Sequence, residues 1–382
     1  MKKTLALLLA VAFAVPAFAG NIFSNVETYG EIETVGLTTS ANADVKTVAN
    51  RVLFGLGMDL VEDVRSNITF AYTNIWDSDL GDDVNTYLNR IVVAEANVVI
   101  SNIFGAIETK IGRQFYGNED SAVMYWGPRH GNYANITMPE SMDGALATWS
   151  NDSMAVSAFY GQIADVSGIY GDDERLTGLT FDYAFTNNLT AGVYWYDYNN
   201  YIFLDHLGIW GGKIAYQNEG AKLGVEYAKN YKGHVFGHNN EGWMLKADAA
   251  MNLDMEAIAL TPRVAYYHAE KDFVATGNYA PGIILGNVNG PLDDGLNWRV
   301  LNAGIDFGFK ALEKVTFAFD YLAAEQDRHW VANEFDLKAI YQHNDYVSFT
   351  LGGAIATKFG ANSPIVYDKD LYAGQLGMLI KF

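Results

Sequence analysis

Gln375-Leu376-Gly377-Met378-Leu379-Ile380-Lys381-Phe382 is the stretch from which the fold can be inferred. Successive side chains of an extended chain point to opposite faces, so residues two apart share a face. One face of this stretch is wholly apolar, with Leu376, Met378, Ile380 and Phe382. The other face carries Gln375, Gly377 and Lys381 beside one apolar residue, Leu379. The alternation predicts a strand that has one apolar face.

The same alternation recurs along the sequence and predicts an all-β chain. Residues 48–60, for example, place Val52 and Phe54 on one face and Arg51 and Gly55 on the other. Eighteen segments show the pattern, with sixteen strands as the alternative count. The segments span residues 26–36, 48–60, 67–73, 90–100, 105–114, 142–149, 154–161, 176–185, 189–197, 207–216, 221–230, 242–251, 256–268, 297–309, 315–325, 333–341, 346–358 and 371–382.

The connections between these segments alternate in length. Short polar turns fall at residues 61–63, 101–102, 150–153, 186–188, 217–220, 252–254 and 342–345. Longer acidic or glycine-rich loops fall at residues 77–86, 116–140, 163–174, 269–296 and 359–370. Short turns on one rim and long loops on the other are typical of bacterial transmembrane barrels. Eighteen strands of about 11 residues, eight turns of about 4 and nine loops of about 15 also fit the length of the chain.

The composition excludes several other classes of protein. The formal net charge of −20 opposes nucleic-acid binding, because phosphate contacts require basic residues. The absence of cysteine excludes a disulfide framework and thiol chemistry. No apolar run after residue 19 reaches the roughly 18 residues that a membrane-spanning helix needs. With 14% aromatic residues and 37 glycines, the chain fits an all-β protein that is either soluble or embedded in a membrane.

A soluble sandwich or propeller is the rival fold, in which the apolar faces would meet in a core. Charges deep within the predicted strands, such as Lys246 and Asp248, oppose it because a water-filled interior explains them better. Six of the eight tryptophans also fall near strand ends that lead into long loops, as in an interfacial belt. These are Trp76, Trp195, Trp210, Trp243, Trp298 and Trp330. The sequence therefore predicts one transmembrane antiparallel up-and-down β-barrel.

Residues 1–19 are predicted to be a cleaved secretory signal. Lys2 and Lys3 precede an apolar run over residues 5–15, and an Ala-Phe-Ala cleavage pattern follows at residues 17–19. Eleven apolar residues are too few to cross a bilayer as a helix. We therefore expect residues 20–382 to be exported through the periplasm and to form one outer-membrane barrel, with both ends on the periplasmic, short-turn side.

The sequence resembles the Gram-negative outer-membrane porins, in pattern, over all of residues 20–382. The motifs that carry the resemblance are Val26-Glu27-Thr28-Tyr29-Gly30, Gly112-Arg113-Gln114, Met142-Asp143-Gly144, Glu334-Phe335-Asp336-Leu337 and the terminal strand. Two of these motifs, Gly112–Gln114 and Glu334–Leu337, also resemble the eighteen-stranded alginate-export branch. The arginine-lined path that a channel for a polyanion needs is not evident. Residues that resemble the carboxy-terminal assembly signal of such barrels are Gln375, Gly377, Ile380 and Phe382.

In porins the third long loop folds into the lumen and narrows it. Here that loop spans residues 116–140, and the resemblance implies that four of its residues reach the constriction. They are Glu119, Asp120, Arg129 and His130. The alternative is a loop exposed outside the cell.

Strand parity predicts which charged residues face the interior, although a one-residue bulge would reverse it. The acidic set is Glu31, Glu33, Glu95, Glu108, Asp182, Glu226, Asp248, Asp306, Asp320 and Asp336. The basic set is Arg51, Lys110, Lys213, Lys246, Arg263 and Lys338. More acids than bases predict a modest cation preference, by the logic of charged rings in pores. The alternative is that these residues only keep the wall wet.

Passive diffusion of small hydrophilic solutes and ions is the favoured function. A sugar-selective channel with Tyr194 and Tyr196 as a stacking track, a polysaccharide-export channel, a barrel enzyme such as a lipid hydrolase, and a structural surface protein are the alternatives. No cofactor, metal or catalytic residue is predicted. The expected partners are outer-membrane lipid, lipopolysaccharide, the barrel assembly machinery and the solutes themselves, with a possible homotrimer.

Overall fold

The computed structural model of the protein describes residues 24–40, 45–76, 90–133, 136, 139–164, 175–200, 204–235, 238–277, 279–289, 292, 295–359 and 369–382. The predicted signal segment, residues 1–19, lies outside the described residues.

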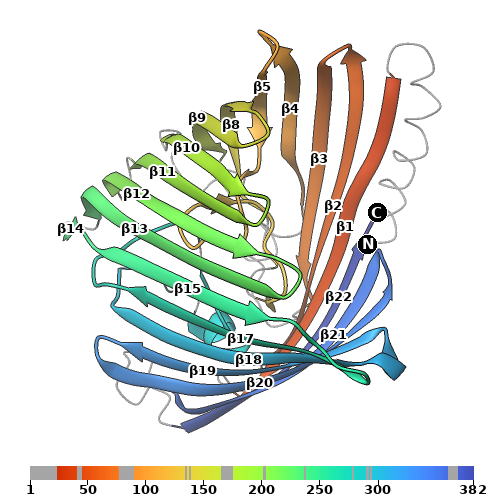
Figure 1. Ribbon diagram of the computed structural model, residues 1–382, viewed down its shortest axis with the longest axis vertical. Coiled ribbons are helices and arrows are strands. Elements are labelled where there is room, and N and C mark those ends of the chain that lie inside the picture. The colour runs from red at the N-terminus through yellow and green to blue at the C-terminus, as the bar shows by residue number, and fades with distance from the viewer. Residues whose placement is uncertain are drawn as a thin grey trace.

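An antiparallel sheet closes on itself to form a barrel (Figure 1). The sheet has 20 strands, of which two are short extensions, β14 (His238–Asn240) and β16 (Leu253–Asp254), and eighteen form the wall. Each wall strand pairs with its neighbours along the sequence, and β1 pairs with β22. The predicted eighteen-stranded, all-β, up-and-down barrel is confirmed. The wall strands are β1 (Ser24–Thr39), β2 (Val45–Val61), β3 (Val64–Ile75), β4 (Ile91–Ile103), β5 (Ile107–Gln114), β8 (Ser141–Ser150), β9 (Met154–Ala164), β10 (Arg175–Thr186), β11 (Leu189–Asn200), β12 (Leu204–Gln217), β13 (Ala221–Val235), β15 (Trp243–Met251), β17 (Ile258–Ala269), β18 (Trp298–Phe309), β19 (Val315–Gln326), β20 (His329–Asn344), β21 (Val347–Phe359) and β22 (Lys369–Lys381).

The terminal strand, β22, pairs with the first strand and closes the ring. β22 pairs with β1 from Glu31, opposite Lys381, to Thr39, opposite Ala373. Gly30 and Phe382 exchange two further backbone hydrogen bonds at 2.9 and 3.0 Å. The first and last strands therefore hold each other along most of their length, which removes the free edges of the sheet.

The two rims of the barrel differ in the length of their connections. One rim carries only short connections, at residues 62–63, 104–106, 151–153, 187–188, 218–220, 252–257, 310–314 and 345–346, and β1 begins and β22 ends there. Of these, 310–314 contains a 3-10 turn, η3 (Lys310–Leu312). The opposite rim carries the long loops. Not every connection on that rim is long, because β11 and β12 are separated by residues 201–203 alone and β19 and β20 are joined by only Asp327 and Arg328. Both have a left-handed backbone, with φ of 50° and 67°, which suits a tight hairpin.

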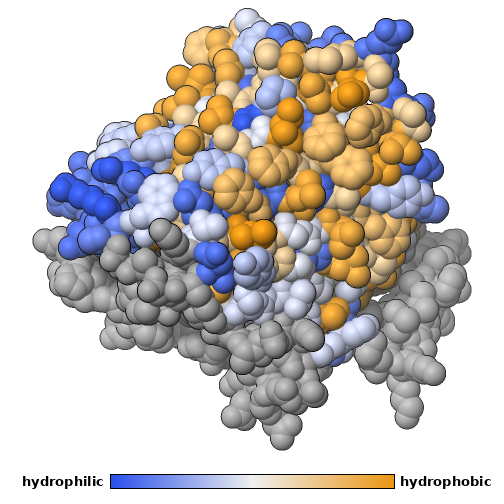
Figure 2. Space-filling view, turned by 90° about the horizontal axis from the view of Figure 1, so that it is seen from below, coloured by the Kyte–Doolittle hydropathy of each residue, from blue (hydrophilic) through white to orange (hydrophobic). Residues whose placement is uncertain are grey.

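The outer wall is apolar, whereas the inner wall carries charged residues together with an apolar area. Leu223, Leu337, Leu351 and Leu376 are among many large hydrophobic side chains that are exposed on the outside. Figure 2 shows such residues gathered over a broad area of one side of the barrel, beside hydrophilic residues at its margins. Among the described residues, no helix is long and apolar enough to cross a membrane. An apolar outer wall of this extent suits contact with lipid.

The predicted tryptophan belt is correct in part. Trp195 and Trp210 are register partners, and the Tyr227 ring lies between Trp210 and Trp243, with centroid distances of 5.8 and 6.3 Å. Trp298, however, is fully buried and does not belong to the belt. The register places it on the interior face of the wall, opposite Ala269 and Gln326. The belt prediction failed there because it used distance from the strand end and ignored parity.

Two loops of the long-loop rim fold into the barrel. The third loop, residues 115–140, contains a small hairpin of β6 (Tyr116–Gly117) and β7 (Tyr125–Trp126). The seventh loop, residues 270–297, contains a short π-helix, η2 (Leu285–Asn289). Both loops contribute fully buried side chains to one apolar cluster with interior residues of the wall. They therefore fill part of the lumen.

Candidate functional site: a constriction between two inward loops

The third loop is held against the wall where the barrel closes. Arg51 on β2 is fully buried and donates to Glu33 at 2.9 Å and to Glu31 at 3.3 Å, both on β1. The same Glu33 carboxylate accepts the backbone N–H of Gly131 at 2.9 Å. On the other side, Gln375 of β22 donates its side-chain amide to the Gly131 carbonyl oxygen. Gly131 is thus bonded to both the first and the last strand.

His130 links the third loop to the same wall. Its Nε2 lies 2.9 Å from both carboxylate oxygens of Glu31, and its Nδ1 lies 2.8 Å from Glu119. Burial alone would lower the pKa of His130, but the bonds with Glu119 and Glu31 outweigh it and raise the pKa to about 9. For Glu119, burial alone would raise the pKa, but the bonds with His130 outweigh it and lower the pKa. At neutral pH an imidazolium therefore bridges two carboxylates, one on the wall and one on the loop.

Glu31, Glu33 and His130 are close enough to share a metal ion, since their donor atoms all lie within 4.8 Å of one another. The carboxylates are already engaged, however, by the Arg51 guanidinium and the His130 imidazolium. A histidine must be neutral at the ligating nitrogen to bind a metal. We therefore assign this cluster to holding the loop.

The seventh loop is held by a pair of buried acids on β20. Glu334 accepts the backbone N–H groups of Ile284 and Leu285 at 2.6 and 2.7 Å. Asp336, two residues further along the same face, accepts that of Ile283 at 3.0 Å. Each acid is 1% exposed. The three consecutive N–H groups belong to the first residue of η2 and the two residues before it, and the two acids satisfy all three donors.

A second set of contacts holds the beginning and the middle of the seventh loop. Asn230 on β13 is fully buried, and its side-chain amide both donates to the carbonyl of Val274 at 2.9 Å and accepts its N–H at 2.8 Å. The rings of Tyr267 on β17 and Tyr279 in the loop stack with centroids 4.3 Å apart. The loop therefore crosses from β13 to β20 inside the barrel.

The two loops are joined to each other in the lumen. The N–H of Thr276 donates to the carbonyl of Val123 at 3.0 Å, so the segments meet as a short β-bridge. Arg129 donates to the Thr276 carbonyl at 2.9 Å, and Asn132 donates to that of Gly282 at 3.3 Å. This inter-loop contact makes the third and seventh loops one connected structure.

A small cavity at the inter-loop contact brings together charges of both signs. It has a volume of about 260 Å³, and its lining includes Glu119, Asp120, Arg129 and Lys246. Lys246 reaches in from β15 and donates to the Asp120 carbonyl at 3.0 Å, with its ammonium 5.6 Å from the centroid of the Tyr279 ring. The contact between the two loops inside the barrel is therefore charged and is braced by the wall.

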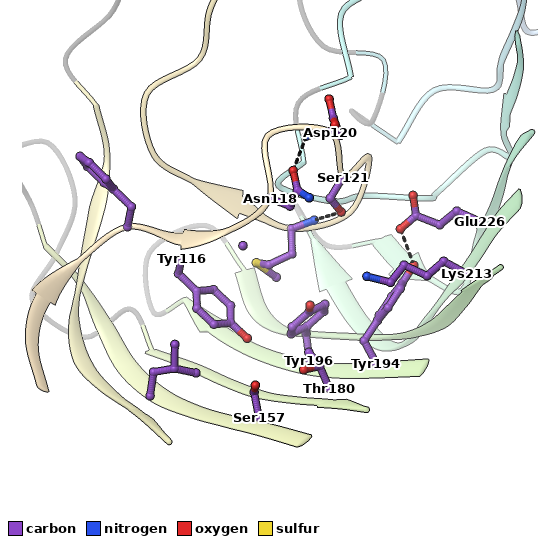
Figure 3. Close-up of a pocket in the computed structure, with 14 residues that line it drawn as sticks. Tyr116, Asn118, Asp120, Ser121, Ser157, Thr180, Tyr194, Tyr196, Lys213 and Glu226 are labelled. Carbon is purple, nitrogen blue, oxygen red and sulfur yellow. Dashed lines mark hydrogen bonds between the residues drawn. The ribbon is translucent and has the colours of Figure 1, made fainter. Parts of the chain in front are cut away.

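A second cavity, of about 390 Å³, lies between the β6–β7 hairpin and the interior face of β8 to β13. Asp120 and Ser121 line both cavities, so the two adjoin. Figure 3 shows the Tyr194 hydroxyl directed at Glu226, with Lys213 beside them. This side cavity lies next to the constriction.

Comparison with solved structures identifies the fold. The chain matches Pseudomonas aeruginosa OprD with a TM-score of 0.63 and 14% sequence identity, over 96% of this chain and 97% of that one. Pseudomonas aeruginosa OccK5 (OpdH) matches with a TM-score of 0.61 and 14% sequence identity, over 94% of this chain and 99% of that one. Acinetobacter baumannii OccAB1 matches with a TM-score of 0.63 and 12% sequence identity, over 95% of this chain and 98% of that one. The chain has the porin fold. No protein-family model and no curated protein sequence matches it.

The porin fold was expected from the resemblance and is confirmed by these matches. Identities of 12% to 14% carry the fold alone, so the properties of this porin barrel have to be argued from its own residues. As the resemblance implied, the third loop lies inside the barrel, and Glu119, Asp120, Arg129 and His130 all lie on its inward course.

The register of the porin barrel places each of the predicted wall charges on its interior face. Several are joined in ion pairs. Arg263 binds both Asp306 and Asp320, Lys110 binds Glu95 at 3.1 Å, and Lys213 binds Asp182 at 3.1 Å. Glu226 stands between Lys213 and Lys246 in register, and Glu108, Asp248 and Lys338 lie on the same face elsewhere in the barrel.

Sequence reasoning missed two important wall residues. Glu334 is not in the predicted acidic set, although it lies two residues from Asp336 and must share its face. Asn230 was also missed, because a single interior amide gives no charge signal. The inward course of the seventh loop had one available signal, the apolar run Ile283-Ile284-Leu285, since such residues seldom lie exposed in a loop.

Proposed function

We propose that the protein is an outer-membrane channel for passive diffusion of small hydrophilic solutes and ions, with a modest preference for cations. The observation that carries the proposal is a closed barrel with an apolar outer wall and charged interior strands. An eighteen-stranded barrel is wide enough to hold water, and its outer wall is suited to lipid. The two inward loops then set the size of the aqueous path.

The cation preference is supported by the balance of charge in the lumen. Four of the predicted interior bases are paired with acids: Arg51 with Glu31 and Glu33, Lys110 with Glu95, Lys213 with Asp182, and Arg263 with Asp306 and Asp320. Further acids remain on the same face, and the exposed Asp120 lies at the narrow part. Net negative charge along a confined path raises the local concentration of cations.

Ion flow through the refolded protein in planar bilayers tests the proposal. We expect stepwise conductance, and in a potassium chloride gradient a reversal potential of the sign given by faster cation passage. Asp120→Asn should shift that potential toward zero, whereas Asp152→Asn, in the turn after β8, should leave it unchanged. A purified, folded barrel that passes no ions would overturn the channel.

A substrate-selective channel for sugars or for an exported polysaccharide is the second candidate, favoured by the hydroxyl-lined side cavity. A barrel enzyme is disfavoured. A lipid hydrolase needs a serine and a histidine together on the outer wall, whereas His130 is bonded to carboxylates inside the lumen. We further propose lipid and lipopolysaccharide as neighbours of the outer wall, β22 as the strand recognised by the barrel assembly machinery, and a homotrimer as the assembly to test.

A further inference from the structure

The side cavity next to the constriction is rich in hydroxyl groups. They come from the third loop and from three neighbouring wall strands, and they surround a space of about 390 Å³ (Figure 3). The hydroxyl-bearing side chains are Tyr116, Ser121, Ser157, Thr180, Tyr194 and Tyr196. This volume is at the small end of the range for ligand pockets.

The three tyrosines are held in place by packing. Tyr194 and Tyr196 stack with centroids 5.4 Å apart, and Tyr116 stacks on Phe159 at 4.2 Å. Each tyrosine is less than one-tenth exposed. Their ring faces are covered, so the stacking track expected over Tyr194 and Tyr196 is not available. The hydroxyl groups of Tyr116 and Tyr196 are bonded to each other and that of Tyr194 donates to Glu226, so these hydroxyl oxygens can still accept a bond from a solute. Because the rings are already fixed, hydrogen bonding to them costs little conformational entropy.

Charges of both signs stand side by side in the cavity wall. Lys213 and Glu226 are register partners on β12 and β13. Lys213 also pairs with Asp182 at 3.1 Å, and Tyr194 donates to Glu226 at 2.9 Å. A solute with net negative charge would meet Glu226, and a solute with net positive charge would meet Lys213. A neutral solute is repelled by neither side chain and can form hydrogen bonds with both.

We propose that this cavity is a binding subsite for a neutral polyhydroxylated solute about one sugar ring in size. Hydroxyl groups both donate and accept, and the cavity wall supplies donors and acceptors from several directions. Met124 and Leu146 add apolar surface for the carbon-bound hydrogens of such a ring. The subsite rests on the proposed channel function, because a solute reaches it from the constriction through the shared residues Asp120 and Ser121.

Blockage of ion current by sugars tests the subsite. Glucose or maltose added to the wild-type channel in a planar bilayer should interrupt the current in a concentration-dependent way. Arginine and citrate, as a cationic and an anionic probe, should block at least tenfold more weakly than glucose at equal concentration.

Two variants locate the binding in the cavity. Glu226→Gln removes a charged acceptor and should raise the half-blocking glucose concentration about tenfold, while ion flow persists. Tyr194→Phe removes one hydroxyl group from a packed ring and should raise it severalfold. Glu219→Gln makes the same acid-to-amide change in the exposed turn between β12 and β13 and should leave the blockage unchanged.

The outcomes separate the subsite from the channel. A conducting wild-type protein that neither sugar blocks, or that arginine or citrate blocks more strongly, overturns the subsite and leaves the channel standing. Absence of any ion flow overturns both. If Glu226→Gln does not fold, as judged by its mobility in gels before and after heating, Tyr194→Phe decides alone: an unchanged glucose blockage then overturns the subsite.

Discussion

The third and seventh loops both lie inside the barrel, but different chemistry holds them there. The third loop depends on charged side chains, with His130 and Arg51 between Glu31, Glu33 and Glu119. The seventh loop depends on its own backbone N–H groups, which donate to carboxylates of the wall. The first arrangement requires particular charged residues in the loop, whereas the second bonds to the backbone and leaves the side chains of residues 283–285 to pack in the apolar cluster. Perturbations should therefore affect the two loops differently.

Replacing Arg51 should have the largest effect. Arg51→Leu leaves Glu31 and Glu33 without their guanidinium partner in a buried place, which we expect to lower the free energy of unfolding by about 3–5 kcal/mol. It should also loosen the third loop and raise single-channel conductance. Urea unfolding and bilayer recording measure the two effects. Arg65→Leu, which removes a partly exposed arginine from ion pairs on the short-turn rim, should cost less than about 1 kcal/mol. Equal costs for the two variants would contradict this account.

Replacing the acid that holds the seventh loop should come next. Glu334→Gln keeps the shape of the side chain but turns an amide N–H₂ toward one of the backbone N–H groups, at an expected cost of about 1–3 kcal/mol. Conductance should rise through release of the seventh loop, and proteolysis of the folded barrel should become faster within residues 279–289. Glu313→Gln, in the exposed turn between β18 and β19, is the matched control. Unchanged stability and conductance in Glu334→Gln would show that these hydrogen bonds do not hold the loop.

Alkaline pH should loosen the third loop through His130, a group that the seventh loop does not depend on. The pKa of His130 is raised from 6.5 to about 9, so its stabilisation of the third loop is complete below about pH 6.5 and is lost as the pH rises through about 9. We expect current fluctuations to increase across this range in the wild type. His130→Gln should fluctuate at every pH, whereas His343→Gln, on the exposed short-turn rim, should behave as the wild type does. Current fluctuations in the wild type that do not change with pH would show that protonated His130 does not stabilise the third loop.

The smallest effect is expected at the contact between the loops. Lys246→Gln removes a positive charge from the constriction and retains a donor for the Asp120 carbonyl. Cation preference should increase modestly, with a stability change within about 0.5 kcal/mol. Reversal potentials in a salt gradient measure the change. A shift toward anions would mean that ions do not pass Lys246.

The barrel was predictable because its signal is repeated and local. Each strand alternates with a period of two, and the closed register accepts only one assignment of faces, so the interior positions of residues such as Lys246 and Asp320 followed from parity. The third loop was expected inside through the resemblance, and its charged residues could be named in advance. Their pairing could not be predicted, because contacts such as the one between His130 and Glu31 depend on the path of the loop.

The seventh loop shows what alternation cannot reveal. The backbone N–H groups of Ile283, Ile284 and Leu285 form the hydrogen bonds that hold it, and every residue except proline has such a group. The sequence therefore shows only an apolar run at these positions. Trp298 was misplaced for a related reason, because nearness to a strand end does not say which face a residue takes. The spacing of residues along the chain predicted the strands, whereas the contacts between loops and wall depend on how the closed barrel brings distant residues together.

The position of Gly131 ties the width of the bore to the completion of the ring. Its N–H is held by the first strand through Glu33, and its carbonyl is held by the final strand through Gln375. A half-assembled sheet, in which these strands have not yet met, cannot offer both partners. We therefore expect the third loop to reach its place only after β1 and β22 have paired, and we expect a barrel that opens between these two strands to widen before it unfolds.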